Sequence, residues 1–178
     1  RAILGREGGV AIHVITISHN TTVFWDEYIA HRMGLIPIRP SASHVKACAS
    51  AAHAATIASS AQRPCSFPPI GSMTLSAENT TSSVHLVTAG QLVSDSFEPI
   101  YPDMPIVYLS PNTKLQFVAH VHANVGRSHS RFCPALPSME VGSLTIEAHG
   151  FMSPKDVLSE SLDAVETELD LIVTRDLS

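Results

Sequence analysis

The C-terminal segment carries the pattern that most constrains how this chain folds. Five apolar residues follow one another at spacings of four and three: Leu158, Leu162, Val165, Leu169 and Ile172. This heptad-like spacing is typical of a helix that packs through a narrow stripe on another helix or on a sheet. Ser153, Pro154 and Asp156 are the residues that begin such a helix, as N-cap, first-turn proline and capping-box acid. The sequence therefore predicts a helix over 153–174.

The faces of this helix outside the apolar stripe are acidic. The residues concerned are Glu160, Asp163, Glu166, Glu168 and Asp170.

A second helical pattern lies near the N-terminus. Trp25, Ile29 and Met33 recur every four residues, with Phe24 and Tyr28 beside them. Threonines at 21–22 precede this pattern and a glycine at 34 follows it, so we expect a helix over 22–34. Together the two helices offer more apolar surface than one small sheet needs, which indicates a partner interface.

The middle of the chain is rich in strand patterns. We expect strands over 10–17, 72–77, 83–88, 106–109, 115–121 and 143–148, with a loop over 126–131 and another between 134 and 141. The clearest alternation directs four residues to one face: Leu115, Phe117, Ala119 and Val121. Residues 41–69 are rich in Ala and Ser and are expected to form an insert or surface segment, partly helical. The predicted class is α+β.

Composition limits the classes of function. The 178 residues are 44% hydrophobic and 15% charged, so the chain can bury a core and is not disordered by composition. Its net charge of −5 disfavours a stand-alone nucleic-acid binder, which would normally be basic. No apolar stretch is long enough for a membrane helix, so no membrane partner is expected.

Metal binding has only weak support in the sequence. His120 and His122 share one face of a strand and form an H-x-H pair, but a third ligand at a defined spacing is missing. Two histidines on a polar strand face are therefore the favoured interpretation. Cys48, His53 and Cys65 are weak candidates for zinc ligands because no C-x-x-C pair is present. A zinc site is doubtful on this ground.

Two further groupings of residues are candidates for function. Cys133 with His129 is a possible thiol and base, and with His120 and His122 it supports an alternative, a small stand-alone metal-dependent or thiol enzyme. The proline after Cys133 and the absence of an activating helix N-terminus disfavour it. Arg127, His129 and Arg131 make a small basic loop suited to phosphate or to an acidic partner surface.

One long motif resembles a known family. The segment D-E-Y-I-A-H-R-M-G-L-I-P-I at 26–38 is similar to the D-E-x-I-A-H-R-L-G-L-I-P-[IL] stretch of the alpha-like subunits of multisubunit DNA-directed RNA polymerases. Segments at 1–12, 87–92, 105–109, 115–134 and 146–158 resemble further stretches of that family in the same order, whereas 41–70 is unmatched. The form of the motif resembles the archaeal and eukaryotic branch. Within it the third-largest subunit of RNA polymerase II is nearest, and the counterpart shared by polymerases I and III is the competitor.

The resemblance implies a discontinuous dimerisation domain, 1–38 with 143–178, and a β-rich insert domain, 39–142. It implies a nuclear, non-catalytic assembly platform that pairs with a smaller alpha-like subunit, docks the second-largest subunit and joins the small subunits. Mg²⁺ chemistry and nucleic-acid reading would belong to other subunits. The dimer interface would comprise Trp25, Tyr28, Ile29, Met33, Leu158, Leu162, Val165, Leu169 and Ile172. The large-subunit contact would comprise Arg127, His129 and Arg131.

Overall fold

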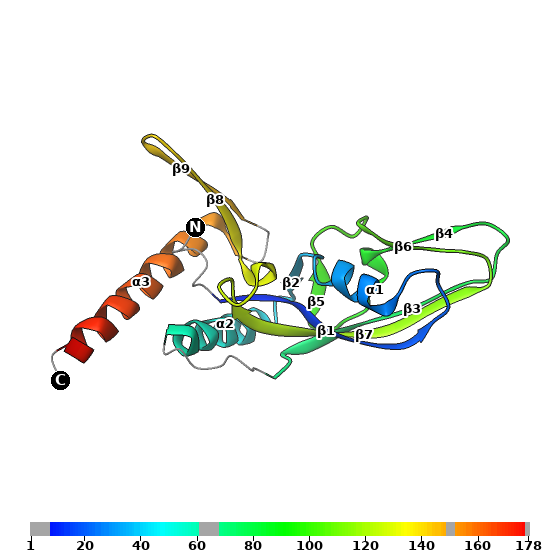
Figure 1. The fold of residues 1–178 in the computed structure, drawn as a ribbon, viewed down its shortest axis with the longest axis horizontal. Helices are drawn as coiled ribbons and strands as arrows, with labels where there is room; N and C mark the ends of the chain where they lie inside the picture. Colours follow the sequence, from blue (N-terminus) through cyan, green and yellow to red (C-terminus); the bar gives the residue numbers. More distant parts are fainter. Residues whose placement is uncertain (1–7, 61–67, 149–151, 177–178) are drawn as a thin grey trace. The chain divides into compact units, whose positions relative to one another are not determined.

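The structure is a computed structural model that describes residues 8–60, 68–148 and 152–176. The chain divides into two compact units. The sheet unit comprises residues 11–46 and 68–122, and the hairpin–helix unit comprises the remainder, 1–10, 47–67 and 123–178. Strands and helices are mixed along the chain, so the fold is α+β, as predicted (Figure 1). The division into a dimerisation domain and an insert domain stays a prediction, because these units divide the chain at other positions.

A three-stranded sheet forms the centre of the sheet unit. Its order is β1 (Gly8–Asn20), β7 (Thr113–Val125) and β3 (Gly71–Asn79), with the central strand antiparallel to β3. Four side chains were predicted to share one face of β7, and all four are buried: Leu115, Phe117, Ala119 and Val121. The residues between them are half-exposed. The period-two pattern therefore predicted the buried face of this strand correctly.

Two short antiparallel pairs complete the strands of the sheet unit. β2 (Ile38–Pro40) pairs with β5 (Phe97–Pro99), and β4 (His85–Thr88) pairs with β6 (Pro105–Leu109), with the 3₁₀ turn η1 (Ala89–Gln91) following β4. An ion pair of 2.6 Å between Arg39 Nε and Glu98 Oε1 joins the first pair. The sequence did not predict β2 and β5, since three residues beside prolines show no measurable period.

Helix α1 (Asp26–Met33) is shorter than the predicted helix over 22–34. The amide of Asn20 explains its late start. Asn20 Oδ1 accepts from the backbone N–H of Thr22 at 2.9 Å, and Asn20 Nδ2 donates to the carbonyl of Phe24 at 2.9 Å. These bonds hold the preceding residues in a turn. Gly34 ends the helix as predicted, with its N–H donating to the carbonyl of Ala30.

A second asparagine repeats this arrangement after β3. Asn79 Oδ1 accepts from the N–H and the hydroxyl of Thr81, at 3.0 and 2.7 Å. Asn79 Nδ2 donates to the carbonyls of Ser83 and Leu109, at 2.8 and 2.9 Å. The side chain is buried, so these bonds satisfy polar atoms away from water and fix the turn between β3 and β4.

The hairpin–helix unit contains most of helix α2 (Val45–Ser60), which confirms that 41–69 is partly helical. The helix buries a stripe of small residues, Cys48, Ala52 and Ala55. Elsewhere in the unit the 3₁₀ turn η2 (Ser130–Phe132) lies against the start of β1. A Cβ on Gly9 would lie 2.0 Å from the carbonyl oxygen of Phe132, so only glycine fits this close backbone approach.

An antiparallel hairpin precedes the last helix. β8 (Ala135–Glu140) pairs with β9 (Ser143–Ala148) around a turn in which Gly142 has φ of +82°. The predicted strand 143–148 is confirmed, whereas the loop predicted between 134 and 141 was wrong, because β8 occupies Ala135–Glu140. Pro137 is tolerated because β8 belongs to a sheet of two strands, where its outer edge needs no N–H donor.

Helix α3 (Pro154–Asp176) begins at the predicted capping box. The hydroxyl of Ser153 donates to Asp156 Oδ2 at 2.6 Å and accepts from the N–H of Asp156 at 3.2 Å. Its first turns pack on the hairpin through Val157, which joins Ala135 and Ile146 in a small core. This core fixes which face of α3 is covered by its own chain.

Several predictions fall on residues that the structure does not describe. These are the segment resembling the family at 1–7, Cys65, the side chain of His53 and residues 149–151. Among the described helices, none has the length and hydropathy needed to cross a membrane.

Candidate partner interface

The predicted apolar stripe of α3 lies on the surface of this chain. Leu158, Leu162, Leu169 and Ile172 are 39, 60, 56 and 51% exposed, and Val165 is half-buried. We call Leu158, Leu162, Val165, Leu169 and Ile172 the α3 seam. Large apolar side chains in a continuous row are costly to leave in water, so such a row marks a surface that another molecule covers.

A different stripe of the same helix packs within the hairpin–helix unit. Val157, Ser161 and Ala164 are buried, again at spacings of four and three. The hydroxyl of Ser161 donates to the carbonyl of Val157 at 2.7 Å, which satisfies the one polar group on this stripe. Because residues one apart on a helix differ in direction by about 100°, the buried stripe and the seam lie on adjacent faces. The helix is therefore covered by its own chain without using the seam.

The hairpin adds an apolar surface that the sequence analysis missed. Met139 pairs with Leu144 on the hairpin face that carries Ala135 and Ile146, and both members of the outer pair are exposed. This face thus runs from the small core on Val157 out to an uncovered tip. The alternation Ala135, Pro137, Met139 was the available signal, but two prolines concealed it.

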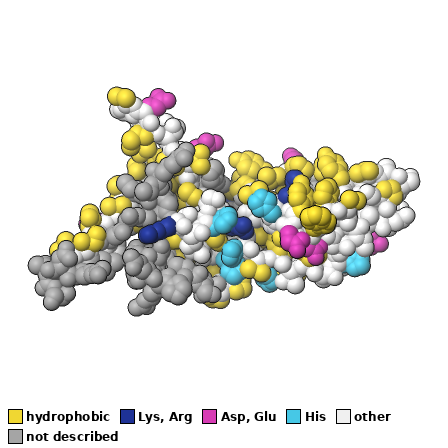
Figure 2. Space-filling view, in the orientation of Figure 1, with side chains coloured by type: hydrophobic (Ala, Val, Ile, Leu, Met, Phe, Trp, Pro, Cys, Tyr) yellow, Lys and Arg dark blue, Asp and Glu magenta, His cyan; other side chains and the backbone are white. Residues whose placement is uncertain are grey.

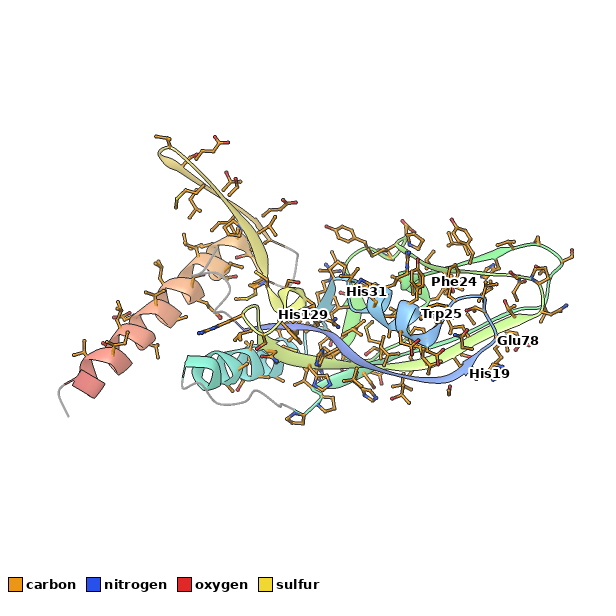
Figure 3. The ribbon with its side chains drawn as sticks, in the orientation of Figure 1. His19, Phe24, Trp25, His31, Glu78 and His129 are labelled. Atoms are coloured by element: carbon orange, nitrogen blue, oxygen red, sulfur yellow. The ribbon has the colours of Figure 1, made fainter. Side chains whose placement is uncertain are left out.

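Helix α1 divides the residues predicted for the interface. Trp25 is 80% exposed and Tyr28 is also exposed, stacked on Phe24 with ring centroids 5.1 Å apart. Ile29 and Met33 are instead buried in their own unit, which corrects the prediction that they face a partner. Figure 2 shows hydrophobic side chains at the surface around α1, and Figure 3 shows Phe24 and Trp25 at the start of that helix.

The basic loop after β7 is held by its own histidine. The backbone N–H and the Nε–H of Arg131 both donate to His129 Nδ1, each at 3.2 Å. Arg131 is half-buried, and this burial lowers the pKa of its guanidinium. Arg127 is exposed. The loop therefore presents an exposed Arg127, while Arg131 is bonded back to the loop at His129, which Figure 3 labels.

The histidines of the sheet form a ring contact. His13 on β1 and His122 on β7 meet edge to face with centroids 5.4 Å apart, while His120 lies opposite Ser72 on β3. Across the residues that the structure describes, no group of three or more His, Cys, Asp or Glu side chains is arranged to hold a metal ion. The H-x-H pair thus has no third ligand in this part of the chain.

The cysteines are placed differently from one another. Burial raises the pKa of the Cys48 thiol to about 11, so the protonated form dominates at neutral pH. The thiol of Cys133 donates to the carbonyl of Ala135 at 3.0 Å, and His129 accepts from Arg131. These bonds do not form the thiol–imidazole pair that the alternative enzyme requires.

Comparison with known proteins identifies the family and its relatives. The model of the RNA polymerase Rpb3/RpoA insert domain matches residues 15–149. The "DNA-directed RNA polymerase subunit Rpo3" of Aeropyrum pernix is 28% identical over 142 residues, covering 76% of this chain and 46% of the relative. The protein of the same name from Pyrobaculum calidifontis is 30% identical over 143 residues, covering 78% of this chain and 50% of the relative.

A third relative with this name, from Methanothermobacter thermautotrophicus, is 28% identical over 127 residues, covering 70% of this chain and 44% of the relative. The chain spans about half the length of the curated relatives it matches. All three come from archaea, so they support the polymerase resemblance without supporting polymerase II or a nucleus. The family model covers most of the sequence, and the chain belongs to the RNA polymerase Rpb3/RpoA insert domain family.

Proposed function

We propose that this chain is a non-catalytic assembly subunit of a DNA-directed RNA polymerase, which pairs with a smaller alpha-like subunit. The names of the Rpo3 relatives support the polymerase, and the exposed α3 seam supports the pairing. The seam is the single observation that carries the proposal, because the adjacent stripe of the helix is already buried, with Val157 packed on the hairpin.

The partner helix would lie along the α3 seam, and Trp25 and Tyr28, before and within α1, are proposed as further partner contacts. Seams of this spacing pack as in helix bundles and coiled coils, where apolar residues of each helix fill spaces on the other. The hairpin tip at Met139 and Leu144 would add apolar area. Ile29 and Met33 contribute indirectly, by holding α1 on the sheet unit.

The second-largest polymerase subunit is proposed to contact the basic loop. Arg127 offers an exposed guanidinium suited to an acidic surface, and the bonds of Arg131 to His129 fix the loop behind it. Small polymerase subunits are further proposed partners. The proposal is made for a polymerase of the archaeal and eukaryotic type, without assigning one of the nuclear polymerases or a compartment.

We also propose that the chain supplies neither catalytic residues nor a metal ion to the polymerase reaction. Mg²⁺ would be held by the catalytic subunits. For zinc, the raised pKa of Cys48 disfavours the thiolate that binds the metal. Elemental analysis of the purified chain should give well under one zinc per molecule, and a stoichiometric value would restore Cys48, His53 and Cys65 as candidate ligands.

Substitution of the seam tests the pairing. Leu162→Asp or Leu169→Asp places a charge in the proposed apolar contact and should abolish co-purification of the smaller subunit with tagged chain from the native host. Thr167→Asp is the matched control, because it adds the same charge to an exposed position of α3 outside the seam. Retention of the partner by both seam variants would refute the pairing through α3.

A further inference from the structure

We infer that the helix covering the α3 seam is flanked by Lys and Arg, and that the acidic charge of α3 excludes a second copy of this chain. The inference rests on the proposed function, since it assumes that the seam is a helix-packing surface. The proposed function says nothing of the charge of the partner helix, and this charge is what we infer from α3.

The charge of the chain is concentrated on this one helix. Helix α3 contains seven acidic and two basic residues, so it carries a net charge of −5. The whole chain has 16 acidic and 11 basic residues, also a net −5. The remainder of the chain therefore balances nine acidic residues with nine basic ones. A net negative charge of this kind favours a partner surface of opposite sign.

The acidic side chains are ordered relative to the seam. Asp163, Glu166 and Asp170 are exposed and follow one another at spacings of three and four. On a helical projection this row lies on the side of the seam opposite the buried stripe of Val157 and Ser161. Helix α3 thus has a buried stripe, an apolar seam and an acidic row, in that order around its axis.

Two members of the acidic row, Asp163 and Glu166, are not neutralised within the part of the chain that the structure describes. Neither Asp163 nor Glu166 has an ion-pair partner there, whereas acids of the sheet unit are paired, Glu98 with Arg39 and Glu78 with Lys114. Glu166 directly follows the seam residue Val165, at the edge where helix pairs in coiled coils place their charged residues. A partner that covers the seam would meet this row.

Two copies packed seam to seam would bring acidic rows together. Like charges beside a helix contact disfavour association, and opposite charges select the partner and its orientation. A second copy of the chain is thereby excluded, although the apolar seam alone would accept it. A helix with a matching apolar stripe and basic flanks fits both features.

Charge reversal on the chain itself supplies a probe of known chemistry. The variant Asp163→Lys/Glu166→Lys/Asp170→Lys keeps the seam and makes the row basic. Sedimentation equilibrium at low salt should show that wild type and this variant pair with each other at least about tenfold more tightly than either pairs with itself. Raising NaCl from about 0.05 to about 0.5 M should weaken the mixed pair, because salt screens exposed charges.

The matched control moves the same change in charge away from α3. Asp95→Lys/Asp103→Lys/Glu140→Lys substitutes three exposed acids outside the helix and should not pair with wild type. Equal affinities of wild type for itself and for the α3 variant, or no mixed pair at all, would overturn the inference about charge. A mixed pair that survives Leu162→Asp in both chains would instead refute the seam, and with it the proposed function.

Discussion

At the scale of single residues, one apolar stripe serves two purposes. Trp25, Ile29 and Met33 share a helical spacing, but Trp25 precedes the first residue of α1 and lies outside the packed face. Spacing alone predicted that the three would act together. The turn fixed by Asn20 delays the start of the helix, which leaves Trp25 exposed while Ile29 and Met33 are buried.

Met33 and Trp25 should therefore respond differently to truncation. Met33→Ala should lower the free energy of unfolding by about 2–5 kcal/mol, because it removes a fully buried side chain. Trp25→Ala should change it by no more than about 0.5 kcal/mol, since the side chain is largely exposed. Urea unfolding of both variants measures this contrast. A large loss of stability in Trp25→Ala would show that the tryptophan is packed in its own chain.

Cys48 should make stability depend on pH in the alkaline range. Its folded pKa of about 11 lies above the 9.0 of an exposed thiol, so the thiol stabilises the fold fully below pH 9 and this contribution is lost as pH rises through 11. By pH 10.5 the loss of unfolding free energy should reach about 2 kcal/mol. Denaturant unfolding at pH 8 and pH 10.5 measures it, with Cys48→Ala as control. The same pH dependence in wild type and variant would contradict this origin.

At the scale of elements, the sequence predicted the helices and strands whose apolar residues recur at a regular spacing over many residues. The α3 seam, its capping box and the buried face of β7 all follow from spacing. The sequence did not predict strands β2 and β5, because each has only three residues and their pairing joins segments far apart in the chain. It did not predict β8 either, because prolines interrupt the pattern of that strand. The exposed tip at Met139 was missed because the same prolines conceal the alternation of β8, and Met139 shares its face with Leu144 of β9.

The turn of the β8–β9 hairpin offers a test at this scale. Gly142 adopts φ of +82° with nothing within 4 Å of where a Cβ would lie. Gly142→Ala should therefore cost about 1 kcal/mol through backbone strain alone, and Gly142→Asn less. Amide hydrogen exchange should quicken along β8 and β9 in Gly142→Ala and stay unchanged in α1. Unchanged exchange in the hairpin would contradict the left-handed turn.

At the scale of the whole molecule, the exposed apolar surfaces belong to both units. The α3 seam and the hairpin tip lie on one unit, and Trp25 and Tyr28 lie on the other. The positive mean hydropathy of +0.16 agrees with a chain that leaves part of its apolar surface to other subunits. Composition alone did not show which elements carry that surface, because a buried and an exposed Leu or Val contribute equally to the mean hydropathy.

Association should consequently stabilise the chain in proportion to partner concentration. Addition of the smaller subunit at about 100 times its Kd should stabilise the folded chain by about 2.7 kcal/mol, and the Tm should rise accordingly. Calorimetry over a range of partner concentrations measures the rise in Tm. The Leu169→Asp variant should show no rise. A Tm that does not change with partner concentration would contradict stabilisation by binding.

The two asparagine turns have a consequence for production of the chain in glycosylating hosts. Asn20 and Asn79 both begin Asn-Thr-Thr triplets, which have the sequence of N-glycan acceptors. In the fold both amide nitrogens already donate hydrogen bonds within the chain, and Asn79 is buried. A glycan on Asn79 would remove one of its two amide hydrogens and introduce a sugar where no space exists. A chain that enters a secretory pathway must therefore escape modification at Asn79 before it can close this turn.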